Sequence, residues 1–296
     1  MKRLLVTGAG GFVGAHVVRN ALPTWEVHGL SGKPQPGALE GARWHVGDIA
    51  HGGYVKETLY HVRPDAVVHC AAIADIDYCE SHKDDADRIN VDVTREIAGV
   101  CRTLGIRLVH CSTDTVFQGE QGLYREDDAV NPVNYYGQTK VKAEQTVQQQ
   151  LTDYSIARIA LVMGYPVAGD GNSFLAKWVK AWTAHACVEV PENEVRTPID
   201  CPTLSRALVE LAGRKETGVF HLAGDDCLNR FEIAKRVALA LDFDPALVEP
   251  TDSSQMKGRA PRPRDCSLVN ARARSLLATP LCGLEEGLRR IMIERK

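Results

Sequence analysis

A tyrosine and a lysine near the middle of the chain have a spacing that suits proton transfer. Tyr136 and Lys140 lie four residues apart, so a helix would place both side chains on one face. A phenol has an ordinary pKa of about 10 and exchanges protons poorly at neutral pH, but a nearby ammonium favours the phenolate and lowers that pKa. The pair could therefore move a proton to or from a carbonyl oxygen. The alternative is an exposed helix pair that does no chemistry.

Two hydroxyl residues end the strand pattern that precedes this helix. Ser112 and Thr113 follow the apolar run at residues 108–111, and Asp114 comes directly after them. In an open α/β sheet, ligands bind beyond the carboxyl ends of the strands, so a hydroxyl group at this position could hydrogen-bond a substrate carbonyl. Residues of these types also cap turns. The pattern alone leaves both roles open.

Three glycines near the N-terminus have the spacing of a phosphate-binding turn. Gly8, Gly11 and Gly14 follow a strand pattern at residues 4–7 and precede a helical pattern at residues 13–18. Glycine allows a positive φ, a close approach of a pyrophosphate to the backbone, and close packing of a helix on a strand. The start of the helix adds free N–H groups and a positive dipole end. This context predicts a dinucleotide-binding turn, with a ligand-free glycine turn as the alternative.

Strand and helix patterns alternate through the first half of the chain. Strands are predicted at residues 4–7, 25–30, 43–49, 64–72, 108–113 and 155–162. Helices are predicted between them, and strands that helices separate form a parallel sheet covered on both faces. We therefore expect an α/β fold, a Rossmann-type doubly wound parallel sheet with a smaller, discontinuous α/β domain for the substrate. The first domain is predicted at residues 1–163, with returns near 195–225, and the second at 164–194 and 226–296.

Composition excludes several classes of partner. The chain has 296 residues, and its net charge of -3 argues against a nucleic-acid partner. No apolar run approaches the ~20 residues that span a membrane, and the first strand pattern begins too early to leave room for a signal peptide. The nine cysteines include no C-x-x-C pair, and the ten histidines lack ligand spacing. We expect a cytoplasmic protein with reduced thiols, no metal site and no membrane partner.

Taken together, the glycine turn, the Ser-Thr pair and the Tyr-x-x-x-Lys pattern resemble the extended short-chain dehydrogenase/reductase family. Within that family the chain resembles the dTDP-4-dehydrorhamnose reductase group. The patterns Thr-Asp-x-Val-Phe-x-Gly at 113–119 and Arg-Pro-x-x-x-Ser-Leu at 262–268 are typical of this group. Further matching segments cover most of the chain and lie at residues 6–14, 47–49, 69–72, 136–140 and 171–174, with Asp77 and Glu80.

The resemblance implies a nicotinamide cofactor, a nucleotide-sugar substrate and roles for individual residues. Cofactor contacts would come from Gly8, Gly11, Phe12 and Val13 at the pyrophosphate, Asp48 and Ile49 at the adenine, and Ala71 and Ala72 at the ribose and phosphates. Thr113 would hold the substrate carbonyl, Tyr136 would donate the proton, and Lys140 would bind the nicotinamide ribose. The sugar nucleotide would be approached by Asn172, Phe174 and Arg262. The chain departs from the family pattern at Ala74, Leu161 and Met163, which leaves the exact sugar undetermined.

The end of the second predicted strand favours NADPH over NADH. Enzymes that use NAD commonly place an acidic residue there, where it binds the ribose 2′-hydroxyl. In this chain the position is occupied by Ser31, Gly32 and Lys33, and the next acidic residue is Glu40. The hydroxyl and the ammonium could donate to a 2′-phosphate. NAD stays an alternative, because the group that the chain resembles often accepts both cofactors.

Our leading hypothesis is an NADP-dependent reductase of a nucleotide-linked 4-keto-6-deoxy sugar, with Tyr136 as the proton donor. One alternative is a nucleotide-sugar epimerase or dehydratase of the same fold. Another is a non-catalytic subunit that resembles the regulatory β subunit of methionine adenosyltransferase. The sequence does not determine the sugar, its nucleotide or the oligomeric state, for which a homodimer is one option.

Overall fold

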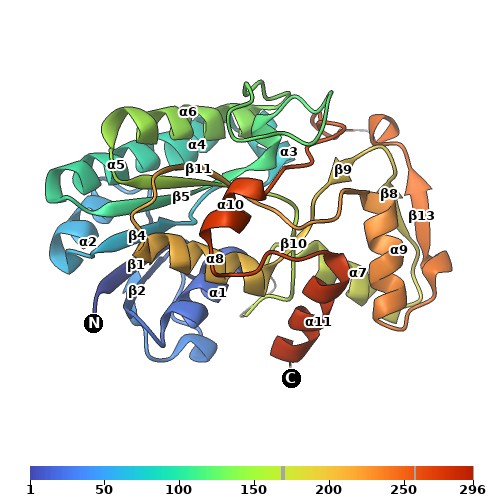
Figure 1. Ribbon diagram of the computed structural model, residues 1–296, viewed down its shortest axis with the longest axis horizontal. Coiled ribbons are helices and arrows are strands. Elements are labelled where there is room, and N and C mark those ends of the chain that lie inside the picture. Colours follow the sequence, from blue (N-terminus) through green and yellow to red (C-terminus); the bar gives the residue numbers. More distant parts are fainter. Residues whose placement is uncertain (168–170, 257, 296) are drawn as a thin grey trace.

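A parallel sheet forms the centre of the computed structural model, which describes residues 1–167, 171–256 and 258–295 (Figure 1). Its strand order is β11-β6-β5-β4-β1-β2-β3, and every neighbouring pair is parallel. The strands are β1 (Arg3–Thr7), β2 (Glu26–Ser31), β3 (Arg43–Val46), β4 (Ala66–His69), β5 (Arg107–Thr113), β6 (Tyr154–Ile159) and β11 (Gly218–Leu222). The chain order reverses between β1 and β4, and such a reversal opens a crevice at the carboxyl ends of the strands.

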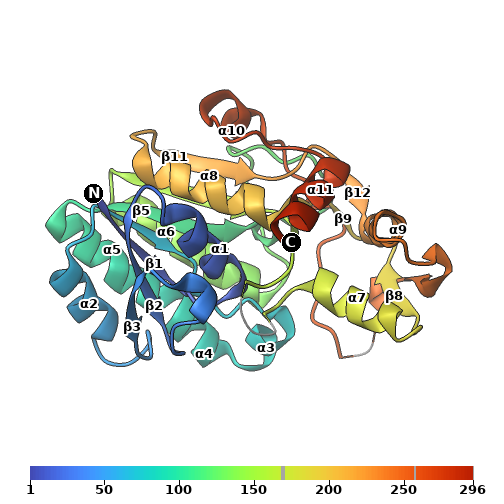
Figure 2. The same cartoon turned by 90° about the horizontal axis from the view of Figure 1, so that it is seen from below.

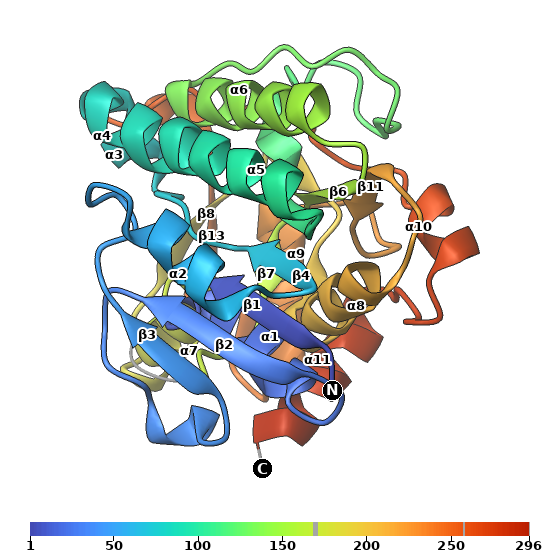
Figure 3. The same ribbon diagram turned by 90° about the vertical axis from the view of Figure 1, so that its left-hand side faces the viewer.

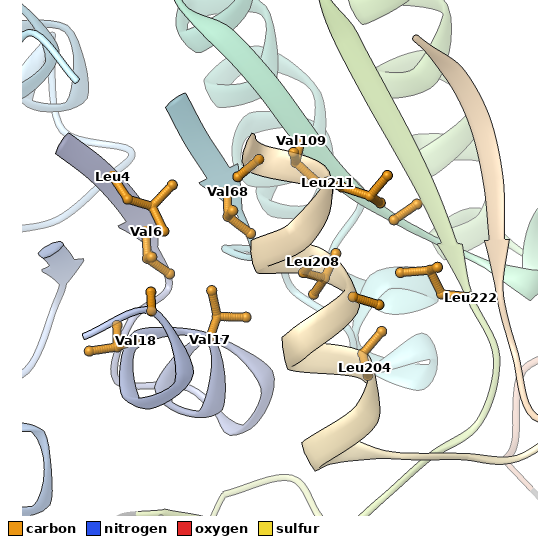
Figure 4. Packing of buried hydrophobic residues seen from close by; sticks show 14 of the residues in the cluster. Leu4, Val6, Val17, Val18, Val68, Val109, Leu204, Leu208, Leu211 and Leu222 are labelled. Atoms are coloured by element: carbon orange, nitrogen blue, oxygen red, sulfur yellow. The ribbon is translucent and has the colours of Figure 1, made fainter. Parts of the chain in front are cut away.

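Helices cover both faces of this sheet, which Figure 3 shows between two helical layers. One layer contains α1 (Phe12–Ala21) and α8 (Cys201–Gly213), and the other contains α2 (Tyr54–Val62), α5 (Val93–Leu104) and α6 (Tyr135–Gln150). Strand residues alternate between the two layers, as their two-residue period requires. Leu4 and Val6 pack with α1 and α8, as Figure 4 shows, whereas Leu5 packs with the other layer. The predicted Rossmann-type doubly wound sheet is confirmed.

The helix predicted before β5 is more complex than its sequence pattern indicated. The chain first forms α3 (Ile76–Ser81), whose N-cap Asp75 accepts a hydrogen bond from the Tyr78 amide. It continues as α4 (Lys83–Asp87), one π-helical turn at Arg88–Asp92, and then α5. A π-helical turn inside an α-helix is common at functional sites.

A smaller lobe lies beyond the carboxyl ends of the strands (Figures 1 and 2). Its elements are α7 (Phe174–Thr183), β8 (Val188–Pro191), β9 (Val195–Arg196), β12 (Leu228–Asn229), α9 (Arg230–Ala240), β13 (Val248–Thr251) and α11 (Leu284–Arg295). Trp178 and Trp182 of α7 share its core with Ile233 and Val237 of α9. The chain forms three further elements. In chain order, β7 (Val162–Met163) follows β6, β10 (Ile199–Asp200) precedes α8, and α10 (Ala271–Leu276) precedes α11.

The predicted domain boundaries stay a prediction. Residues 168–170, 257 and 296 of the predicted second domain lie outside the described residues. Within the described ranges, no helix combines the length and the apolar character needed to cross a membrane.

The α8 layer offers a test of the core. Leu208 is fully buried between α8 and the sheet, so Leu208→Ala should lower the free energy of unfolding by about 2–5 kcal/mol. Leu239→Ala on α9 is the control, because Leu239 is 59% exposed and its truncation leaves no cavity. Urea unfolding followed by circular dichroism measures both. Equal losses for the two variants would contradict the packing described here.

Candidate active site

The glycine turn between β1 and α1 has the geometry of an anion-binding site. Gly8 has a φ of +66°, and a Cβ on Gly14 would lie 2.1 Å from the Gly8 carbonyl oxygen, so the helix packs directly on the turn. No side chain of the described residues caps α1 at Gly11. The first amides of a helix have no intrahelical acceptor, so those of Phe12 and Val13 are available to a ligand. A dinucleotide pyrophosphate fits this arrangement.

A cavity of about 520 Å³ lies beside the turn, at the carboxyl ends of β1, β2 and β4. It brings together seven residues predicted to bind the cofactor, namely Gly8, Ser31, Gly32, Asp48, Ile49, Ala71 and Ala72. Ser31 is buried, and its hydroxyl accepts a hydrogen bond from the Lys33 amide at 3.1 Å. Ile89 also lines this cavity, and sequence reasoning missed it because it lies in what reads as an ordinary helical segment.

A larger cavity, of about 970 Å³, joins the turn to the smaller lobe. Predicted cofactor residues line one part of it, namely Gly8, Gly11, Phe12, Val13, Lys33 and Ala72, and the predicted sugar residues Asn172 and Phe174 line another. Cys70, Lys177 and Arg230 line it as well, although no local sequence pattern marked them as ligand-binding residues. Ligand pockets typically enclose ~300–1,000 Å³, so the two cavities have the size of binding sites.

Arg262 does not join this group. Its guanidinium donates to Asp77 Oδ2 at 2.9 Å and to the Ala260 carbonyl at 2.8 Å, and it does not line either cavity among the described residues. The contact with Arg262 contributes to lowering the pKa of the Asp77 carboxyl. In this structure the ion pair ties the loop before residue 268 to α3.

The predicted proton-transfer residues lie on two neighbouring elements, α6 and the end of β5. Helix α6 begins after Asn134, whose side chain accepts from the Gly137 amide at 2.9 Å, and it presents Tyr136 and Lys140 on its buried face. Thr113, at the end of β5, lies close enough to the Tyr136 phenol to influence its pKa, and its hydroxyl donates to Asp114 Oδ1 at 3.1 Å. The described residues that line the two cavities do not include Thr113, Tyr136 or Lys140.

Ser112 has a different role from Thr113. Its hydroxyl donates to Glu144 Oε1 at 2.5 Å, and Glu144 also accepts from the Arg158 guanidinium at 2.9 Å. All three side chains are buried. Because Glu144 lies one turn after Lys140, this network fixes α6 to β5 and β6 and holds the catalytic candidates in place.

The pKa of Tyr136 moves in the direction opposite to our expectation. Burial is the main cause of the increase, and the nearby Asp114 carboxylate adds to it, whereas the neighbouring Thr113 hydroxyl opposes it. The expected lowering by Lys140 is wrong for this structure, because that ammonium is not among the strongest influences on the phenol. The pKa of Asp114 is itself raised by burial, although Arg196 lies 3.6 Å away. Tyr136 therefore stays protonated across the neutral range.

Lys140 is the other buried ionisable group. Burial lowers its pKa to about 8, so the ammonium form predominates at neutral pH. Its Nζ lies 3.2 Å from His110 Nε2, and sequence reasoning did not single out this histidine. Throughout residues 1–167, 171–256 and 258–295, no three His, Cys, Asp or Glu side chains gather in a way that could hold a metal ion.

A glycine turn at the reversal point of a doubly wound sheet, followed by a buried Tyr-x-x-x-Lys pair, defines the extended short-chain dehydrogenase/reductase class. Comparison with known proteins agrees with this class. Residues 1–296 match the model of the "RmlD substrate binding domain" family. The dTDP-4-dehydrorhamnose reductase of Mycobacterium tuberculosis is 31% identical over 88% of this chain and 83% of its own. The chain belongs to this family.

Two further relatives extend the comparison. The Bacillus anthracis dTDP-4-dehydrorhamnose reductase, solved in complex with NADP, superposes with a TM-score of 0.88 at 25% identity, over 99% of each chain. Methionine adenosyltransferase 2 subunit beta of Bos taurus is 27% identical over 100% of this chain and 90% of its own. The resemblance predicted from the motifs is confirmed.

The glycine turn can be tested directly. Gly14→Ala would force its Cβ against the Gly8 carbonyl, so we expect a loss of about 1–3 kcal/mol of stability and markedly weaker dinucleotide binding. Gly37→Ala is the control, since nothing lies within 4 Å of its Cβ. Thermal unfolding and titration of NADPH fluorescence measure the two effects. Normal binding by the Gly14 variant would refute the role of this turn.

Proposed function

We propose that this protein is an NADP-dependent reductase of a nucleotide-linked 4-keto-6-deoxy sugar. The observation that carries the proposal is the placement of Thr113 at the carboxyl end of β5 beside the buried Tyr136 of α6, with Lys140 one helical turn further along that helix. Two hydroxyl donors that meet at one point suit a carbonyl oxygen that gains negative charge. The reductases among the relatives support the same reading.

The glycine turn, the smaller cavity and the part of the larger cavity next to the turn would hold the cofactor. The amides of Phe12 and Val13 would bind the pyrophosphate, and Ser31 and Lys33 would meet the 2′-phosphate. Bound NADPH would supply the hydride that reduces the keto carbon. The relative solved with NADP supports this choice, and NAD stays an alternative, because the relative "MoeE5" is solved with NAD.

Tyr136 would protonate the oxygen of the substrate. A phenol whose pKa is raised by burial remains in its acid form at neutral pH, which is the form that a proton donor needs. Thr113 would donate a second hydrogen bond to the same oxygen. Lys140, with a pKa of about 8, would keep a positive charge beside the nicotinamide ribose and the developing oxyanion.

The part of the larger cavity on the side of the lobe would take the sugar nucleotide. Asn172 and Phe174 line it on the side of α7, and the cationic Lys177 and Arg230 lie in the same wall. Arg262 would have to leave Asp77 to reach a substrate, which makes its predicted contact conditional on movement of that loop. We also propose that the chain divides into a cofactor domain and a substrate domain. A homodimer is part of the same proposal.

A second candidate is a non-catalytic regulatory subunit. The observation in its favour is the bovine methionine adenosyltransferase 2 subunit beta, which matches the whole length of this chain. Two experiments separate the candidates. A reductase oxidises NADPH when a nucleotide-linked keto sugar is added, whereas a regulatory subunit captures a partner enzyme in a pull-down and leaves NADPH unchanged.

Cofactor preference gives the first test. We expect a higher kcat/KM with NADPH than with NADH, because Ser31 and Lys33 stand where NAD enzymes place a carboxylate. Lys33→Glu should lower the preference for NADPH by roughly tenfold or more, since it replaces a charge-assisted contact by repulsion. Lys56→Glu on the exposed surface of α2 is the control. A wild-type preference for NADH would overturn the assignment.

The proton donor gives the second test. Tyr136→Phe should lower kcat by about 10²–10⁴-fold, the usual contribution of general acid catalysis, with NADPH binding near normal. Thr113→Val should lower kcat by a smaller factor, and Lys140→Met should also weaken NADPH binding. Tyr135→Phe is the matched control, because the Tyr135 hydroxyl donates to Asp87 at 2.7 Å. The assays use a panel of nucleotide-linked 4-keto-6-deoxy sugars, and full turnover by Tyr136→Phe would rule out this mechanism.

A further inference from the structure

His110 lies on β5 with no solvent exposure, directly against the ammonium of Lys140. The distance from His110 Nε2 to Lys140 Nζ is 3.2 Å, and within the described residues this imidazole is the one hydrogen-bond partner of that ammonium. The remaining ring nitrogen, Nδ1, is buried and has no partner in the described part of the chain. Lys140 therefore depends on a single protein acceptor.

The chemistry of the two groups decides which of them donates. Burial, together with the charge of Lys140 and the nearby His69, keeps the pKa of His110 well below its usual range, so the imidazole is neutral. An ammonium has three donors and no acceptor. His110 Nε2 must therefore carry the lone pair, and the ring proton must sit on Nδ1.

The other ionisable groups around Lys140 are engaged elsewhere or uncharged. On β4, His69 hydrogen-bonds Thr7 at 2.7 Å and Thr94 at 3.0 Å, and burial lowers its pKa to about 3. Glu144, on α6, is bound to Arg158 and Ser112. The remaining groups nearby are the thiols of Cys70 on β4 and Cys111 on β5, which lie 3.6 Å apart, and the phenol of Tyr136 on α6.

We propose that His110 is a positioning residue that holds the Lys140 side chain in place and keeps it protonated at neutral pH. The inference rests on the proposed role of Lys140 in binding the cofactor. Glu144 and the two thiols also favour the charged form of Lys140, but within the described residues none of them hydrogen-bonds its ammonium. The acceptor fixed by the strand therefore decides where the ammonium lies and adds to the stabilisation of its charge. Without His110, Lys140 would lose its proton at a lower pH.

The pH dependence of NADPH binding tests this role. In the wild type, the affinity for NADPH should be highest below the pKa of Lys140, at about 8, and should fall as the pH rises through that value. His110→Phe should move this fall downwards by about one to two pH units, because hydrogen bonds to charged groups contribute that much. Affinity near about pH 5.5 should stay close to that of the wild type, while affinity near about pH 7.5 should drop several-fold.

Two variants separate positioning from a general effect on folding. His110→Gln keeps an acceptor oxygen near the place of Nε2, so it should restore the wild-type profile. His221→Phe changes a second buried histidine, on β11, whose Nδ1 pairs with the Val269 carbonyl and not with Lys140. His221→Phe should leave the pH dependence of NADPH binding unchanged. An unchanged profile in His110→Phe, or an equal shift in His221→Phe, would overturn the proposal.

A spectroscopic readout needs no substrate. Two-bond ¹⁵N–¹H correlation spectra of the histidine rings should show His110 in its Nδ1–H tautomer without titration between about pH 5.5 and 8. An Nε2–H tautomer would refute the proposal. The role of Lys140 is tested separately, because Lys140→Met should remove the pH dependence of NADPH binding. If the wild type itself shows no such dependence, the proposed function of Lys140 fails, while the tautomer still decides the contact with His110.

Discussion

The burial of the Lys140 ammonium is the constraint around which the middle of the structure is arranged. Its side chain is only 2% exposed, and its hydrogen bond goes to a neutral imidazole, not to a carboxylate. Glu144, one turn along the same helix, is already neutralised by Arg158. A buried charge without a directly bound counter-ion is unfavourable, which is why its pKa falls to about 8. The edges of β4 and β5 and the inner face of α6 supply the polar groups that keep the charge inside.

The glycine turn imposes a second constraint, on the position of α1. Because Gly14 packs within contact of the Gly8 carbonyl, the helix starts directly above the reversal of strand order between β1 and β4. The same turn then forms one wall of the larger cavity, and residues 172–177 of the lobe form another. A ligand that spans this cavity contacts segments far apart in the sequence, so the lobe and the sheet can act on it together.

Local patterns predicted those parts of the site that depend on spacing along one element. The glycine turn and the Tyr136–Lys140 face are of this kind, and so is the alternation of strands and helices. The contact between His110 and Lys140 depends instead on how α6 docks on β5, which no local pattern encodes. The ion pair between Asp77 and Arg262 joins residues 185 positions apart. The raised pKa of Tyr136 follows from burial, which outweighs the expected influence of a lysine on the same helix face.

The energetics of these buried groups bear on the choice between a reductase and a binding subunit. Burial of the Lys140 ammonium is unfavourable, as its lowered pKa shows, so its charge is not what stabilises the packing of α6 on the sheet. Tyr136 packs in a cluster with Cys79 and Ala86, and burial of its phenol raises the pKa of that group, so its hydroxyl is likewise not a favourable packing group. A protein that only bound a nucleotide could use the Lys140 ammonium, but it would gain little from a protonated phenol and a second hydroxyl at the same end of β5. Together these groups suit the transfer of a proton to an oxygen that gains charge, and this favours turnover over binding alone.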